Sequence, residues 1–274
     1  MELLTDRIGM GESPRWHDGR LYGSDWAAGV IVAVAPDGAT EVAATVPAGT
    51  FCFDFRPDGR WLVVADDRLL VGTPGGPLEL YAPLLRRPAN DIVVDGRGNA
   101  YVGVLGFDFG AGEAFPAGPT APGTLLLVRP DRTVLEVAGD LAFPNGVAVT
   151  PDNGTLIIAE SYRSRLTAWD VAADGTLSGR RTWAELGEGT PPDGICLDAT
   201  GAAWFADVPN KQCVRVAPGG AVLDTVLLDR GAFACMLGGR TLFMVANTWG
   251  GVHGTAGGRV YTVPAPAPGA GWPG

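Results

Sequence analysis

The sequence predicts an all-β fold, a six-bladed β-propeller with four antiparallel strands per blade. Three observations favour this prediction. One pattern, a short strand, a polar turn and a more apolar strand, occurs six times at intervals of roughly 40 to 55 residues, as is typical of propeller blades. Glycine (41) and proline (22) are spread along the chain, as expected for many short strands joined by turns. No long amphipathic helical pattern competes with them.

Each of the six copies predicts the two inner strands of one blade. Apolar segments between the copies, such as "GVIVAVAPDGATEVAAT" and "GTLLLVRPDRTVLEVAG", predict the outer hairpin of each blade. A β-sandwich would not produce six similar units, so we expect residues 1–274 to form one propeller domain. In chain order the copies read "GESPRWHDGRLYGSDW", "GTFCFDFRPDGRWLVVAD", "PANDIVVDGRGNAYVGV", "PNGVAVTPDNGTLIIAES", "PPDGICLDATGAAWFAD" and "GAFACMLGGRTLFMVAN".

Composition narrows the classes of partner. The net charge of −10 and the pI of about 4.6 argue against nucleic acid. No apolar run reaches the roughly 18 residues of a membrane span, and the start "MELLTDRIGMGESP" has no signal-peptide pattern, so a cytoplasmic protein is expected. The oligomeric state stays open. The four cysteines have no metal-ligand spacing and are expected to be buried free thiols: Cys52, Cys196, Cys213 and Cys235.

Polar residues occupy one repeated position just ahead of the first strand of several copies. Alignment of the turns makes Glu12, Cys52, Asn90, Asn145 and Asp193 equivalent, with residues 233–235 in sixth place. In a propeller the first strands line the central channel, so these residues should meet at one channel mouth. Two carboxylates and two amides predict a site for one divalent cation, Ca²⁺ before Mg²⁺, Mn²⁺ or Zn²⁺. The alternative is that the Asn-Gly and Asp-Gly pairs are only hairpin turns.

These segments also carry a resemblance. Together, "GESPRW", "PANDIVVD", "FPNGVAVTPD", "PPDGICLDATGAAWFAD" and "RGAFACMLGGRTLF" resemble the SMP-30/gluconolactonase/LRE-like family of regucalcin-like sugar lactonases, in the family's order over nearly the whole chain. The resemblance implies a six-bladed propeller with one divalent metal at the channel mouth. It also implies that Glu12, Asn145 and Asp193 hold the metal and that Asn90 contacts substrate or bound water.

The chain departs from the family pattern beside Asn90. Lactonases of the family have Asn-Asp-Gly where this chain has Asn90-Asp91-Ile92, and a substrate-binding arginine where it has Pro88. Arg87 is the nearest candidate to replace that arginine. Further candidates for substrate contacts lie in the long segment from Gly106 to Gly123 and in the glycine-rich loop after the sixth copy; they are Phe107, Phe109, Trp249 and His253.

The residues and the resemblance together predict a metal-dependent lactonase. One ion would polarise the lactone carbonyl and activate the attacking water. Asp193 would orient or deprotonate the water, with water activated by the ion alone as the alternative, and Asn90 would position water or the ring oxygen. An aldonolactone is the expected substrate. The alternatives are another ester, an aromatic lactone or a phosphoester at the same metal, or a calcium-binding propeller without catalysis. Asn90 favours an enzyme, because a structural ion would not need it.

Overall fold

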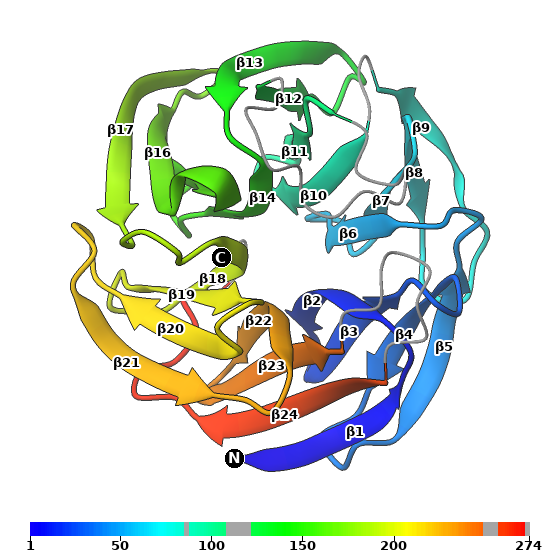
Figure 1. The fold of residues 1–274 in the computed structure, drawn as a ribbon. Coiled ribbons are helices and arrows are strands. Elements are labelled where there is room, and N and C mark those ends of the chain that lie inside the picture. Colours follow the sequence, from blue (N-terminus) through cyan, green and yellow to red (C-terminus); the bar gives the residue numbers. More distant parts are fainter. Residues whose placement is uncertain (85–87, 108–121, 249–256, 272–274) are drawn as a thin grey trace.

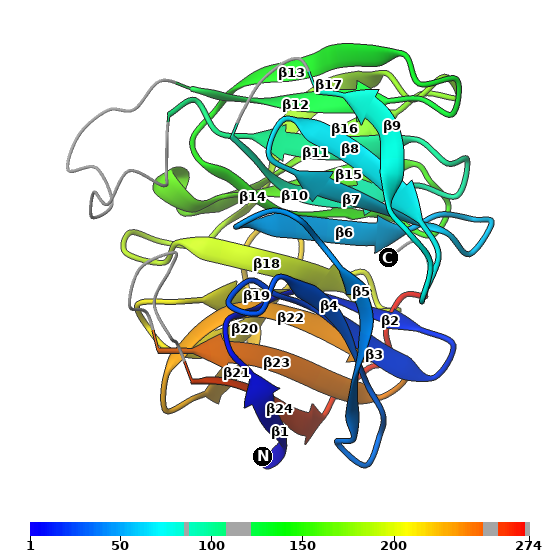
Figure 2. The ribbon, with the colours of Figure 1, turned by 90° about the vertical axis from the view of Figure 1, so that its right-hand side faces the viewer.

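Six four-stranded antiparallel sheets surround one central axis in the computed structural model, which describes residues 1–84, 88–107, 122–248 and 257–271 (Figure 1). The first strands of the sheets lie innermost in the view along the axis (Figure 1). The side view shows sheets above and below the level of this axis (Figure 2). The prediction of a six-bladed all-β propeller is therefore confirmed. Within the described residues the one helix is the short 3-10 helix η1 (Ser161–Arg163).

Five sheets are built from four consecutive strands each, and the first strand of each sheet lies at the channel. The strands of these sheets are β2 (Gly11–His17), β3 (Arg20–Asp25), β4 (Val30–Val34) and β5 (Thr40–Thr45); β6 (Phe51–Phe55), β7 (Trp61–Ala65), β8 (Arg68–Gly72) and β9 (Glu79–Pro83); β10 (Ala89–Val94), β11 (Ala100–Val104), β12 (Gly123–Val128) and β13 (Val134–Leu141); β14 (Pro144–Val149), β15 (Thr155–Glu160), β16 (Arg165–Val171) and β17 (Leu177–Glu185); and β18 (Pro192–Leu197), β19 (Ala203–Asp207), β20 (Gln212–Val216) and β21 (Val222–Leu227).

The sixth sheet joins the two ends of the chain. Its inner strands are β22 (Gly231–Gly238), β23 (Thr241–Asn247) and β24 (Gly258–Pro264), and its outermost strand is β1 (Glu2–Ile8), which pairs antiparallel with β24. This pairing closes the ring and leaves no free edge on β24. The sequence analysis did not predict a strand at this position.

The hydrophobic core lies between neighbouring sheets. Both faces of the inner strands are covered, so segments such as "WLVVA" in β7 are apolar at every position instead of alternating. The large rings of Trp61, Tyr101 and Trp204 have at most 1% of their surface exposed. The four cysteines are buried and free, as the sequence predicted.

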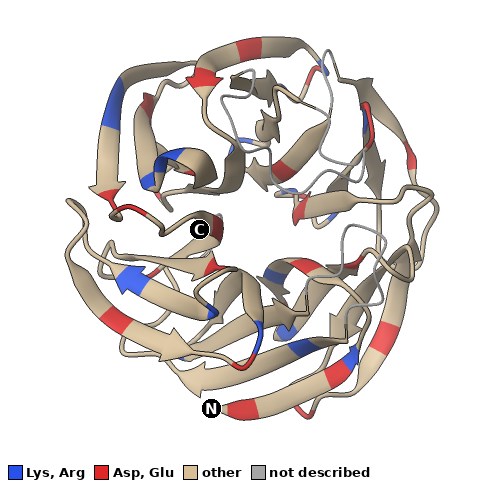
Figure 3. Cartoon of the chain, viewed as in Figure 1, with Lys and Arg blue, Asp and Glu red and all other residues tan. Residues whose placement is uncertain are grey.

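Two further findings concern membrane spans and the distribution of charge. Among the described residues, no helix has the length and the apolar character that a bilayer span requires. Viewed along the axis, the lysine and arginine segments lie among acidic segments around the ring (Figure 3).

At two glycines of the inner strands the neighbouring strand leaves no space for a side chain. A Cβ atom on Gly146 in β14 would stand 2.5 Å from the carbonyl oxygen of Asp193 and 2.5 Å from the nitrogen of Ile195 in β18. A Cβ atom on Gly194 would stand 2.6 Å from the Cβ of Ala234 in β22. All three distances are too short for any side chain, so packing of adjacent strands explains why these two positions are glycine.

Gly146→Ala should therefore destabilise the fold, because the atoms that its methyl group meets are backbone and cannot move aside. We expect a loss of about 2 kcal/mol in the free energy of unfolding, measured by urea denaturation. Gly139→Ala in β13 is the control, since its nearest neighbour would be a side-chain oxygen of Glu136 at 3.6 Å. Equal stabilities of the two variants would contradict this explanation.

Candidate functional site

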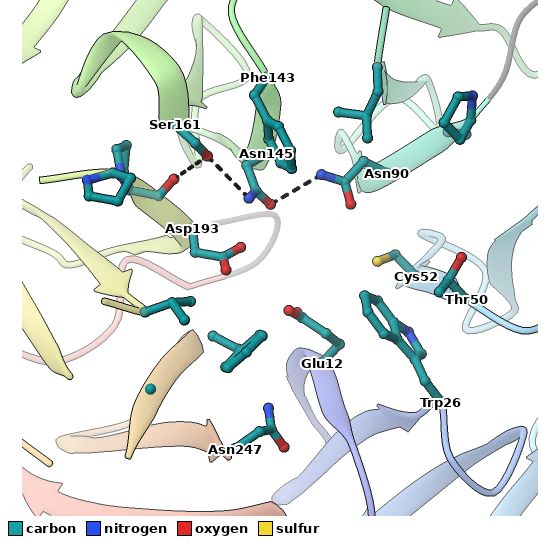
Figure 4. Close-up of a pocket in the computed structure, with 18 of the residues that line it drawn as sticks. Glu12, Trp26, Thr50, Cys52, Asn90, Phe143, Asn145, Ser161, Asp193 and Asn247 are labelled. Carbon is teal, nitrogen blue, oxygen red and sulfur yellow. Dashed lines mark hydrogen bonds between the residues drawn. The ribbon is translucent and has the colours of Figure 1, made fainter. Parts of the chain in front are cut away.

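The polar residues that the sequence aligned lie together at one mouth of the channel. A cavity of about 1390 Å³ is lined by Glu12, Cys52, Asn90, Asn145 and Asp193. Figure 4 shows the carboxylates of Glu12 and Asp193 and the amides of Asn90 and Asn145 directed toward one common space. The hairpin alternative is wrong, because the Asn-Gly and Asp-Gly pairs lie within β14 and β18.

A break in strand register aims each of these four polar side chains. The pairing of the inner strand with its neighbour is irregular at Glu12 in β2, across Asn90 in β10, across Asn145 in β14 and across Asp193 in β18. Bulges of this kind re-aim side chains and are common beside active sites. Cys52 is the exception, since β6 pairs regularly with β7 along its whole length. The polar positions thus share a backbone feature that the cysteine position lacks.

The hydroxyl of Ser161 orients the amide of Asn145. It donates a hydrogen bond to the carbonyl oxygen of Pro192 at 2.7 Å and accepts one from Nδ2 of Asn145 at 3.2 Å. Since the hydroxyl proton is used on Pro192, only the NH₂ group of Asn145 can face Ser161, and Oδ1 turns toward the cavity (Figure 4). Nδ2 of Asn90 donates to the carbonyl oxygen of Pro144 at 3.1 Å and to Oδ1 of Asn145 at 3.3 Å. Both amides therefore present oxygen to the common space.

The two carboxylates are held where ionisation is unfavourable. Burial raises the pKa of Glu12 well above its ordinary value, and the negative charge of Asp193 raises it further, against a hydrogen bond from the backbone of Ser13. Burial also raises the pKa of Asp193 well above its ordinary value; the charge of Asp91 adds to this, and the amide of Asn145 opposes it. A cation between the two carboxylates would reverse both effects.

The donor set fits a hard divalent cation. Glu12 and Asp193 together supply two negative charges, and the oriented oxygens of Asn145 and Asn90 supply neutral donors, a combination that suits Ca²⁺ or Mg²⁺. In the part of the chain that the structure describes, no group of three or more His, Cys, Asp or Glu side chains is placed to hold an ion. The amide oxygens are therefore essential to a metal site here, and the lack of histidine and thiolate pairs disfavours Zn²⁺.

A buried ion network lies next to the polar cluster. Arg15 forms ion pairs with Asp54 at 3.2 Å and with Asp91 at 3.1 Å. Asp91 also accepts hydrogen bonds from the hydroxyl of Ser13 and the backbone of Val147, both at 3.3 Å. The network joins three inner strands to β2, so it stabilises the strand that carries Glu12.

The sixth blade contributes through Asn247, at the end of β23. Its side chain accepts a hydrogen bond from the nitrogen of Gly11 at 2.9 Å and donates one to the oxygen of Gly11 at 3.0 Å, across 236 residues of sequence. This pair of bonds fixes the backbone directly before Glu12. The sequence alone gave no functional prediction for four residues of the site: Asn247, Ser161, Arg15 and Asp91. An alignment of the second strands of the six copies was the signal that would have drawn attention to Asn247 and Ser161.

The remaining predicted contact residues divide into two groups. Phe107 is described and lines the cavity, with Phe233 near the sixth repeat position. The other candidates lie outside the described residues, so their predicted roles are not tested here: Arg87, Phe109, Trp249 and His253. Pro88, which replaces the expected arginine, also lines the cavity.

Known proteins resemble this chain over most of its length. The SMP-30/Gluconolactonase/LRE-like region matches residues 10–248. A 6-deoxy-6-sulfogluconolactonase of Pseudomonas putida is 26% identical over 87% of this chain and 83% of its own, and an L-arabinolactonase of Azospirillum brasilense is 25% identical over 85% and 79%. The crystal structure of a calcium-binding protein, regucalcin, from Agrobacterium tumefaciens superimposes with a TM-score of 0.78 at 18% identity, covering 98% of this chain and 94% of that one. The protein therefore belongs to the SMP-30/gluconolactonase/LRE-like family.

Proposed function

We propose that this protein is a hydrolase that opens a lactone ring with the help of one divalent cation held by Glu12, Asn145 and Asp193. The observation that carries the proposal is the convergence of two carboxylates and two oriented amide oxygens in one cavity (Figure 4). Relatives named as lactonases support the choice of reaction. Calcium is the preferred ion, because carboxylate and amide oxygens are the donors that it favours.

The reaction needs a polarised carbonyl and an activated water. The chemistry that the cation supplies when bound is polarisation of the lactone carbonyl and stabilisation of the charge that develops on its oxygen. Asp193 accepts the proton of the attacking water, whose oxygen bonds to the acyl carbon. The bond between the acyl carbon and the ring oxygen then breaks, and Asp193 returns the proton to that oxygen. The product is a hydroxy acid.

Asn90 positions the reactants. Its NH₂ group is held by Pro144 and Asn145, so its oxygen accepts a hydrogen bond from the attacking water. The names of the relatives favour a sugar lactone, such as an aldonolactone, as the first substrate to assay.

Asp193→Asn should abolish activity and at the same time stabilise the cation-free protein. With gluconolactone and calcium, the loss of the base should lower kcat by about 10²- to 10⁴-fold in a pH-stat assay. In chelator at pH 8 the variant should melt at a higher temperature than the wild type, because it lacks a buried carboxylate whose ionisation opposes folding. Calcium at a hundred times its Kd should stabilise the wild type by about 2.7 kcal/mol and the variant far less.

Asp6→Asn is the matched control, because Asp6 is an exposed carboxylate on β1. It should change neither the activity nor the response to calcium. Wild-type activity in Asp193→Asn, or an undiminished calcium shift of its melting temperature, would contradict the assignment.

Calcium binding should release protons. In the cation-free protein burial raises the pKa of Glu12 and of Asp193, so each carboxyl keeps its proton to a higher pH than an exposed one, and a bound cation would lower both pKa values. Affinity should therefore weaken as the pH falls from 8 to 6. Calorimetry in two buffers with different ionisation enthalpies measures the released protons, and Glu12→Gln should reduce their number. Identical affinity at both pH values would speak against this pair as the ligands.

Ser161→Ala should weaken calcium binding, because the amide of Asn145 loses the partner that orients it. We expect a rise in the Kd for calcium of about 10- to 100-fold, with kcat restored at saturating calcium. Ser178→Ala, at an exposed serine of β17, is the control. A loss of kcat that calcium does not restore would show that Ser161 does more than position Asn145.

A further inference from the structure

Three aromatic rings stand beside the polar cluster. Phe107, Phe143 and Tyr162, here called the aromatic wall, belong to the connection after β11, the turn before β14 and η1, and all three line the cavity. We propose that the aromatic wall binds an alkyl or aryl substituent of the substrate, so that the protein prefers a lactone with an apolar substituent over a polyhydroxylated sugar lactone. This inference rests on the proposed function, because it assumes that the lactone carbonyl lies at Asp193.

The three rings form one continuous surface. The rings of Phe107 and Tyr162 are within 12° of parallel, with centroids 6.0 Å apart. The ring of Phe143 is tilted against both, with centroid distances of 5.7 Å to Phe107 and 4.9 Å to Tyr162. Such a surface offers a large apolar contact area, with ring faces for stacking.

The backbone of Phe143 is strained in a way that suits a binding role. Its φ of 58° is in the left-handed region, which a bulky residue rarely adopts. The surroundings hold this conformation, since Ser161 donates its N–H to the oxygen of Phe143 at 3.1 Å and Tyr162 donates its N–H to the oxygen of Ala142 at 3.1 Å. A carboxylate oxygen of Glu160 accepts from the nitrogen of Ala142 at 2.9 Å. Strain that is held so firmly is typical of ligand sites, and here it fixes the ring two residues before Asn145.

Several polar groups around the cavity are engaged in hydrogen bonds within the protein. The indole N–H of Trp26 donates to the oxygen of Phe51 at 2.6 Å, so Trp26 presents ring carbon to the cavity. The amide of Asn247 is engaged by Gly11, and the hydroxyl of Ser161 by Pro192 and Asn145. A sugar ring needs a partner for each hydroxyl group, and groups that are already bonded would have to break bonds to serve it. An apolar substituent makes no such demand.

Apart from Glu12 and Asp193, several charged side chains that line the cavity are paired with one another or exposed. Arg68 pairs with Asp66 at 3.5 Å, and Arg230 pairs with Asp229 at 2.8 Å; Lys211 is exposed. The volume of about 1390 Å³ exceeds the roughly 300 to 1,000 Å³ of most small-molecule sites. The cavity therefore has room for a substituent next to the ring that is opened.

A set of three lactones tests the preference on the calcium-loaded protein. The set consists of δ-gluconolactone, δ-decalactone with its alkyl chain, and dihydrocoumarin with its fused aryl ring, followed by pH-stat. We expect kcat/KM for at least one apolar lactone to exceed that for gluconolactone by about tenfold or more. A preference for gluconolactone would overturn this inference and leave the proposed function intact.

Removal of one ring tests the aromatic wall itself. Phe107→Ala should lower kcat/KM for the apolar lactone by about tenfold and should lower that for gluconolactone by a clearly smaller factor. Leu80→Ala, at a leucine of β9 that is 57% exposed, is the control for loss of an apolar side chain. Equal losses for both substrates in Phe107→Ala would overturn the assignment.

Binding without chemistry separates failure of this inference from failure of the proposed function. Calorimetry of the calcium-loaded protein compares 6-pentylpiperidin-2-one with gluconolactam, two lactams that resist hydrolysis. Tighter binding of the pentyl lactam, weakened in Phe107→Ala, supports the aromatic wall even if no lactone is opened, which would refute the proposed function alone. Absence of binding, or no preference between the lactams, overturns the inference whatever the hydrolysis assays show.

Discussion

Close packing of six inner strands around one axis is the constraint on which the rest of this structure depends. Neighbouring inner strands contact one another around the channel, and at Gly146 and Gly194 the next strand leaves no space for a side chain. Breaks in register at the same level turn Glu12, Asn145 and Asp193 toward one space. The geometry that packs the propeller is thus the geometry that gathers the polar cluster.

This gathering places like charges together, and only some of the buried carboxylates are paired with a cationic side chain. Beside the cluster, Arg15 forms ion pairs with Asp54 and Asp91. In the cluster itself burial and neighbouring carboxylates raise the pKa values of Glu12 and Asp193, and a hydrogen bond from the amide of Asn145 offsets only part of this rise at Asp193. Such an arrangement would be stabilised by a bound cation, which is why we propose a binding site here and not a structural ion network.

The cavity above the cluster has a different chemistry. Its floor is polar and hydrogen-bonded, and the rings of Phe143 and Trp26 lie beside it (Figure 4). The other two rings of the aromatic wall line the same cavity. In our proposals the floor acts on the carbonyl, and the wall recognises what is attached to the ring. The replacement of the family's expected arginine by Pro88 agrees with this division, because it removes a hydrogen-bond donor and adds an apolar residue to the cavity lining.

The sequence by itself determined the sixfold repeat and the equivalence of Glu12, Asn90, Asn145 and Asp193, because both are expressed in local strand and turn patterns that recur along the chain. Only the tertiary structure decided the pairing of β1 with β24, the tie of Asn247 to Gly11 and the bridge that Ser161 makes between Asn145 and Pro192. These contacts join residues of different strands or blades, and their geometry depends on closure of the ring and on bulges of the backbone. A local pattern of residue types carries neither of these, so they became visible only in the folded chain.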